Sequence, residues 1–268
     1  MPKTALITGT SRAAGLGFAV AQLLSEQDYH VLLTAREPTR AESLATRLPN
    51  ATALRLDLTD PATMTAAADY LADAFGHLDV LVNNASGTVD FAALSALDAD
   101  PAAVQSALDI DVLGPWQLTQ LLLPLLKAAP AARIVNVSSV SALQISTGLD
   151  LGASLRAPAH SFAKHALNTL TGVLASALRN TPILVNAVDP GETATHPERG
   201  DEETARPALE SARGVVWAAT LPSGGPTGGY FLDGQPVLCL LPGNENTAGP
   251  DLSGPGPRRE NPSVRQDQ

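Results

Sequence analysis

The chain has 268 residues, a formal net charge of −10 and an aromatic content of 4%. This length is enough for one large domain with a full core, and an acidic chain without a basic stripe is not expected to bind nucleic acid. The one cysteine, Cys239, excludes an internal disulfide and a cysteine-built metal cluster, and the longest apolar run, 121–126, is too short to span a bilayer.

The first predicted unit consists of a strand, a glycine-bearing turn and a helix. An apolar run at 5–7 predicts a buried strand, the turn runs from Gly9 to Gly17, and residues 18–24 continue with helical spacing. The strand begins almost at the N-terminus, which leaves no room for a signal peptide, so we expect a cytoplasmic protein with no membrane partner.

The glycine turn predicts a pyrophosphate site. Glycines let the backbone approach phosphates, and the free N–H groups at a helix start point toward negative charge. A second strand at 30–36 follows at the distance that a βαβ unit requires. An ordinary turn between a strand and a helix remains the alternative.

Strands and helices alternate along the rest of the chain. Helices begin at Asp60-Pro61 and Asp100-Pro101, each an N-cap followed by proline at the first helical position. The pattern predicts an α/β fold: one Rossmann-type, doubly wound parallel sheet of about seven strands with helices on both faces, over residues 1–241. Residues 242–268 are rich in Pro, Gly, Asn and charge and predict a disordered tail. The expected strands are 5–7, 30–36, 51–58, 78–85, 133–139, 183–188 and 229–233, and the later helices are 60–75, 100–127 and 163–178.

Ligands of such sheets bind at the carboxyl ends of the strands, so residues directly after each strand are the candidates for a site. These candidates are Gly9 to Gly17, Arg36, Asp57, Asn83 to Ser86, Ser138 and Ser139, and Asp189 to Thr195.

Four motifs, in this order, resemble the short-chain dehydrogenase/reductase family over roughly residues 3–240. They are the glycine turn, Asn83-Asn-Ala-Ser86, Ile134-Val-Asn-Val-Ser-Ser139 and Pro190-Gly191-x-x-x-Thr195, and the ending 221–234 is similar to the carbonyl-reductase-like branch. The resemblance implies an oxidoreductase with a nicotinamide cofactor and a small-molecule substrate. The cofactor contacts that it implies are Gly9, Ser11, Arg12, Gly15, Leu16, Gly17, Arg36, Asp57, Leu58, Asn83, Ala85, Lys164, Pro190, Gly191, Thr193 and Thr195.

The basic residue after the second strand predicts NADP(H) as the cofactor. Arg36 stands where a ribose 2′ substituent would lie, and arginine pairs with a 2′-phosphate where an acidic residue would bind the 2′-OH of NAD. Arg12 in the glycine turn is a candidate for the second half of this phosphate clamp. The alternative is two solvated surface arginines.

Two features of the sequence depart from the family pattern. Five residues, 10–14, separate Gly9 from Gly15, two more than in the family, and the extra backbone could reshape the pyrophosphate pocket. The family's Asn, Ser, Tyr and Lys quartet becomes Asp111, Ser139, His160 and Lys164. A decayed site would show the same losses, although both replacements are groups that can move protons.

In the proposed division of roles, Ser139 binds the substrate oxygen, His160 shuttles the proton and Lys164 holds the nicotinamide ribose. Histidine titrates at about pH 6.5 unperturbed. We expect the like charge of Lys164 to lower the pKa of His160, and the negative charge of Asp111 to restore some imidazolium character. The alternative is that His160 only fills the space of the tyrosine.

The long helix is expected to be broken at Asp111. Pro115 has no N–H, so the carbonyl of Asp111, four residues earlier, loses its helical partner, and Gly114 makes a bend easier. In the family a main-chain carbonyl at this position holds a water that relays protons to the lysine. We expect the carbonyl of Asp111 to be free and turned toward Lys164.

Residues 144–158 are long for the family and contain several leucines, which predicts an apolar wall over the site and a largely apolar substrate. The charged segment 195–213 stands where the family has its mobile substrate lid. Three functions remain open: an NADP(H)-dependent carbonyl reductase or alcohol dehydrogenase, a non-redox isomerase, dehydratase or cyclase, and a non-catalytic NADP-binding regulator. A homodimer or homotetramer is also expected.

Overall fold

Parallel strands with buried side chains form the centre of the molecule. The computed structural model describes residues 2–87, 89–146, 156–196, 198 and 200–237, so the predicted tail at 242–268 lies outside the described residues. The main sheet has eight strands in the order β10-β9-β6-β5-β4-β1-β2-β3, and only β10 is antiparallel to its neighbour. The strands are β1 (Thr4–Ile7), β2 (His30–Ala35), β3 (Ala51–Arg55), β4 (Val80–Asn83), β5 (Arg133–Val137), β6 (Leu184–Asp189), β9 (Tyr230–Leu232) and β10 (Gln235–Pro236).

The strand order reverses at β1, which is the topological switch of a doubly wound sheet. β2 and β3 extend the sheet on one side of β1, and β4, β5 and β6 extend it on the other. The predicted fold class is confirmed, with β10 added as a short edge strand. A second, two-stranded sheet pairs β7 (Thr193–Ala194) with β8 (Arg206–Pro207) beyond the end of β6.

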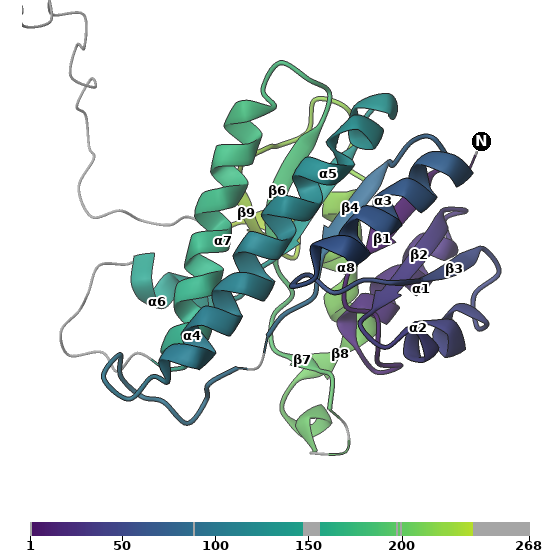
Figure 1. Ribbon diagram of the computed structural model, residues 1–268. Helices are drawn as coiled ribbons and strands as arrows, with labels where there is room; N and C mark the ends of the chain where they lie inside the picture. The colour runs from purple at the N-terminus through teal and green to yellow at the C-terminus, as the bar shows by residue number, and fades with distance from the viewer. Residues whose placement is uncertain (1, 88, 147–155, 197, 199, 238–268) are drawn as a thin grey trace, which may run out of the picture.

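Helices cover both faces of the sheet because alternate residues of each buried strand point to opposite sides. In β1, Ala5 and Ile7 pack with one layer of helices, and Leu6 packs with the other. Figure 1 shows the two layers. The first layer holds α1 (Leu16–Ser25), α2 (Pro38–Ala45) and α8 (Ala208–Ala219), and the second holds α3 (Pro61–Ala74), α5 (Gly114–Ala128) and α7 (Pro158–Ala177), with α4 (Pro101–Leu108) packed on α7. Among these described helices, none is both long and apolar enough to cross a membrane.

The helix predicted at 100–127 is widened at Asp111 rather than broken. A π-helical turn, η1 (Asp109–Leu113), joins α4 to α5, and the N–H of Gly114 donates to the carbonyl of Asp109, five residues earlier. Pro115 cannot donate the α-helical bond to Asp111, so a five-residue spacing takes the place of the regular four. The water-holding role of the Asp111 carbonyl stays a prediction.

Helix α7 begins at Pro158, five residues before the predicted start at 163. The earlier start places His160 and Lys164 on one helix, one turn apart. Short helical turns η2 (Val140–Ala142) and α6 (Leu143–Ser146) follow β5. The middle of the predicted apolar wall, 147–155, lies outside the described residues.

The space around two helical glycines predicts opposite effects on stability when each is replaced by alanine. A Cβ at Gly114 would lie 2.6 Å from the Cβ of Leu58, whereas a Cβ at Gly172 on α7 would meet nothing within 4 Å. Gly114→Ala should therefore lower the free energy of unfolding by about 1–3 kcal/mol through overpacking. Gly172→Ala, the matched control, should raise it by about 0.5–1 kcal/mol through helix propensity. Urea unfolding measures both, and a stabilised Gly114→Ala protein would contradict the close approach of η1 to Leu58.

Candidate active site

The end of β5 carries the serine that sequence analysis placed in the site. Ser139 caps the helical turn η2, and its Oγ accepts a hydrogen bond from the N–H of Ser141 at 3.2 Å. This bond uses the oxygen as an acceptor and leaves the hydroxyl proton available to donate. The neighbouring Ser138 is buried, so Ser139 is the more accessible of the two candidates.

A buried ion pair lies next to this strand end. Lys164 Nζ donates to the carbonyl of Val137 at 2.9 Å and lies 3.8 Å from Asp111 Oδ2. The side chains of Lys164 and Asp111 are only 4% and 1% exposed. The carboxylate also accepts from Ser86 Oγ at 3.0 Å and from the N–H of Gly87 at 3.1 Å. Asp111 therefore connects the π turn to both the Asn83–Ser86 motif and the lysine.

His160 shares this electrostatic environment. Burial and the positive charge of Lys164 lower its pKa to about 4, while Asp111 and Asp90 act in the opposite direction. The expected signs of the Lys164 and Asp111 effects are confirmed. Burial is the largest cause, and the opposing effect of Asp111 is too small to keep the imidazole charged at neutral pH.

Asp90 is a residue of this region that sequence reasoning missed. Its carboxylate accepts from the N–H groups of Ala159 and His160 at 2.9 and 3.2 Å. Asp90 stands far from α7 in the chain and belongs to no motif. The one available signal was the start of α7 itself, where Pro158 follows an alanine that cannot cap the helix.

The glycine turn has the backbone that a pyrophosphate site needs. Gly9 has a φ of 73°, and a Cβ there would lie 2.7 Å from the Cα of Ala85. Gly15, which has no side chain to cap the helix, precedes α1, so the first N–H groups of α1 remain available to an anion. The two additional residues are absorbed in a turn that closes with the N–H of Gly15 donating to the carbonyl of Arg12 at 3.0 Å.

The two predicted phosphate-binding arginines differ in their surroundings. Arg36 is exposed after β2, and its charge acts on Asp57. The side chain of Arg12 instead donates to the carbonyl of Thr195 at 3.2 Å and to Glu198 at 2.6 Å. The role of Arg12 in a phosphate clamp stays a prediction, since the structure ties it to the segment after β6.

Asp57 follows β3 at the same edge of the sheet. Burial raises its pKa, but two hydrogen bonds from Thr59 and the charges of Arg36 and Arg55 outweigh this effect, so the pKa is lowered overall. Asp57 is therefore ionised near neutral pH. Leu58 beside it is buried against Gly114, and Leu16 at the start of α1 is buried as well.

Asn83 is directed into the protein rather than toward a ligand. Its Nδ2 donates to Asn136 Oδ1 at 2.8 Å, and Asn136 Nδ2 donates to Thr171 Oγ1 at 2.8 Å. Any contact of Asn83 with a cofactor would therefore use the main chain. The next residues are fixed to the residue that follows β1, because the N–H groups of Asn84 and Ala85 both donate to Thr8 Oγ1 at 2.9 Å.

The turn after β6 is clamped by a residue from β8. Arg206 donates to the carbonyl of Pro190, and a Cβ at Gly191 would lie 2.7 Å from its guanidinium. Thr193 Oγ1 bonds the carbonyl of Gly191, and the N–H of Thr195 donates to Asp201 Oδ2 at 2.9 Å. Pro190, Gly191, Thr193 and Thr195 thus follow β6 at the carboxyl edge of the sheet, as predicted.

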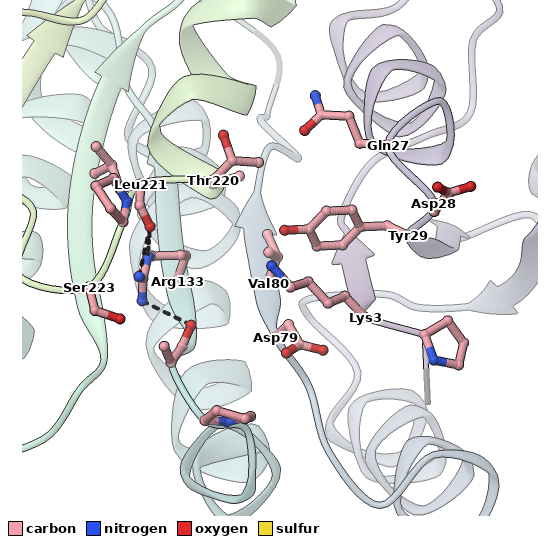
Figure 2. A pocket seen from close by; sticks show the side chains of 15 residues that line it. Lys3, Gln27, Asp28, Tyr29, Asp79, Val80, Arg133, Thr220, Leu221 and Ser223 are labelled. Carbon is pink, nitrogen blue, oxygen red and sulfur yellow. Dashed lines mark hydrogen bonds between the residues drawn. The ribbon is translucent and has the colours of Figure 1, made fainter.

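A cavity of about 720 Å³ lies at the other end of the strands (Figure 2). Its lining includes Lys3, Tyr29, Asp79 and Arg133, which precede or begin strands, so it is remote from the predicted site. Arg133 is buried, and its guanidinium donates to main-chain carbonyls, two of its bonds going to Leu221. These contacts hold the chain at Ala132 and at Leu221 together, which indicates a structural role for Arg133.

The comparisons agree on one family and fold. The family described as short chain dehydrogenase matches residues 3–205. The chain is 33% identical over 250 residues to the short-chain dehydrogenase anuI of Penicillium roqueforti, covering 87% of this chain and 94% of that protein.

Two solved structures are similar at 28% identity. Salutaridine reductase from Papaver somniferum has a TM-score of 0.69 and covers 86% of this chain and 99% of its own. The RhlG/NADP active-site complex of Pseudomonas aeruginosa has a TM-score of 0.73 and covers 87% of this chain and 95% of its own.

The partly buried imidazole of His160 predicts a pH-dependent stability. His160 takes up a proton near pH 4 in the folded protein but at about 6.5 in the unfolded chain. Because the unfolded chain takes up this proton at a higher pH, the free energy of unfolding is at its full value above about pH 6.5 and falls as the pH is lowered toward 4. The loss should reach about 3 kcal/mol, and His160→Gln should remove it. Urea unfolding of both proteins at several pH values measures the difference, and identical pH dependences would contradict a neutral imidazole at this position.

Proposed function

The chain belongs to the short-chain dehydrogenase family, and on that premise we propose that it is an NADP(H)-dependent oxidoreductase that interconverts a carbonyl group and an alcohol on a largely apolar small molecule. The observation that carries the proposal is the cluster of Lys164, Asp111 and His160 at the carboxyl edge of the sheet. Helix α7, which bears two of these residues, packs against η2, which Ser139 caps.

The residues present fit a dinucleotide. The glycine turn and the uncapped start of α1 would hold the pyrophosphate, Arg36 the 2′-phosphate and Lys164 the nicotinamide ribose. The bound nicotinamide supplies the hydride donor or acceptor. NADP is the cofactor named in the similar RhlG structure, which supports this choice over NAD.

The proton chemistry falls to Ser139, His160 and Lys164. The hydroxyl of Ser139 donates a hydrogen bond to the substrate oxygen. In alcohol oxidation, the neutral imidazole of His160 accepts the hydroxyl proton of the alcohol as its carbon loses a hydride. Lys164 keeps its ammonium fixed between Val137 and Asp111 and stabilises negative charge near the substrate oxygen.

The state of His160 favours oxidation at neutral pH. A group with a pKa of about 4 is a base, not an acid, at pH 7. Reduction requires a proton to reach the new alkoxide, and a neutral imidazole cannot give it directly. We infer that the reductive direction gains from lower pH, where His160 becomes protonated.

The same observation supports a second candidate, a non-redox enzyme in which neutral His160 removes a proton from carbon. This activity would proceed with no change in nicotinamide absorbance at 340 nm, whereas oxidation or reduction would change it. Incubation with NADP⁺ and a panel of apolar secondary alcohols, or with NADPH and the matching ketones, therefore separates the two proposals.

Cofactor preference depends on Arg36. A bidentate arginine–phosphate contact should contribute about 1.5–3 kcal/mol, so the wild type should bind NADPH at least about tenfold more tightly than NADH. Arg36→Ala should remove most of this preference, and Arg40→Ala, an exposed arginine of α2, serves as the control that keeps it. Titration calorimetry with both cofactors measures it; equal affinities in the wild type would exclude the proposed 2′-phosphate contact.

Turnover depends on His160. Removing a general base typically costs on the order of 10²-fold or more, so His160→Phe should reduce the rate of NADP⁺ reduction by that factor. His165→Phe replaces the other histidine of α7 and should retain activity. If His160→Phe keeps near wild-type turnover, His160 only fills space and Ser139 and water transfer the proton.

A further inference from the structure

Helix α7 begins without a cap of its own. Its N-cap is Ala157, which has no side-chain oxygen and adopts a left-handed φ of 49°. Pro158 has no N–H, and the N–H of Ser161 already donates to the carbonyl of Ala157 at 2.9 Å. Two donors are left at the start of the helix, the N–H groups of Ala159 and His160.

The loop after β4 satisfies both of these donors. Asp90 Oδ2 accepts from Ala159 at 2.9 Å, and Asp90 Oδ1 accepts from His160 at 3.2 Å. The same loop accepts a third hydrogen bond, which the N–H of Ala157 donates to the carbonyl of Ala93 at 3.1 Å. One carboxylate thus takes the place of a local cap, from a position about 70 residues earlier in the chain.

We propose that Asp90 is a positioning residue of the active site, which fixes the start of α7 and places a negative charge beside His160. The proposal rests on the proposed function, in which His160 moves the proton. Asp90 is bound to the main chain of His160 and so acts on the reaction through His160.

The charge of Asp90 reaches the imidazole as well as the backbone. The charged groups that act on His160 are Lys164 from its own helix, Asp111 from the π turn and Asp90 from the loop after β4. Lys164 lowers the pKa of His160, and the two carboxylates raise it. A negative charge at a helix N-terminus is also favourable in itself.

An ordinary N-cap in the same protein gives the comparison. Asp60 caps α3 through the N-H of Ala62, two residues along, at 3.0 Å, and α3 carries no residue of the predicted catalytic group. Replacing Asp60 removes a helix cap and a charge without acting on His160. A difference between the two aspartates in their effect on His160 is therefore specific to Asp90.

The test follows the His160 ring by NMR in the full chain, with protons as the probe. The Cε1–H signal of His160 is identified by its loss in His160→Gln. At pH 4.5, Asp90→Asn should lower the protonated fraction of the ring by about threefold, equal to half a pH unit in its titration. Asp90→Glu and Asp60→Asn should titrate like the wild type. If Asp90→Asn does not fold, Asp90→Ser keeps an acceptor for the helix without the charge and replaces it.

A His160 ring that titrates identically in the wild type and in the uncharged Asp90 variant would overturn the proposal and leave Asp90 as a local cap. Faster amide exchange of Ala159 and His160 in that variant, together with the shifted titration, supports it. This result is independent of turnover, since an active His160→Phe enzyme would reject the proposed role of His160 while leaving the titration effect of Asp90 intact.

Discussion

The burial of the Lys164 ammonium against Asp111 is the constraint around which the site is built. A buried charge is costly unless it is paired and hydrogen-bonded, and both conditions are met here: Nζ donates to the carbonyl of Val137, and the carboxylate accepts from Ser86 and Gly87. These contacts join four separate parts of the chain, namely the end of β5, the turn after β4, the π turn and α7. The pair therefore fixes the relative position of the elements that form the carboxyl edge of the sheet.

The same burial decides what His160 can do. Loss of water around the imidazole disfavours its charged form, Lys164 adds to this effect, and Asp111 and Asp90 oppose it without reversing it. The outcome is a neutral imidazole beside the ammonium of Lys164. In a tyrosine-based site the ammonium assists by lowering the pKa of an acidic phenol toward 7. Here the same ammonium lowers the pKa of a histidine further below 7. With histidine in place of tyrosine, the unchanged lysine therefore moves the pKa of the neighbouring group away from 7 instead of toward it.

The two ends of the sheet serve different purposes. At the carboxyl edge, the glycine turn, Asp57 and the Pro190–Gly191 turn bring uncapped N–H groups, charges and close backbone together. At the amino edge, the guanidinium of Arg133 donates hydrogen bonds to main-chain carbonyls around a cavity (Figure 2). The cavity at the amino edge is not evidence for the site, because the functional groups of a parallel sheet gather where its strands end.

The sequence by itself determined the parallel sheet, the glycine turn and which residue types stand at the strand ends, because strand periodicity, capping residues and turn glycines are local signals. It also indicated that the helix would be irregular near Pro115, since the missing N–H is a property of one residue. Only the tertiary structure decided that the helix widens instead of breaking, that Arg12 contacts Glu198, and that Asp90 caps α7. It also decided the net charge state of His160. Each of these depends on burial or on contacts between residues far apart in the chain, and no local pattern contains that information.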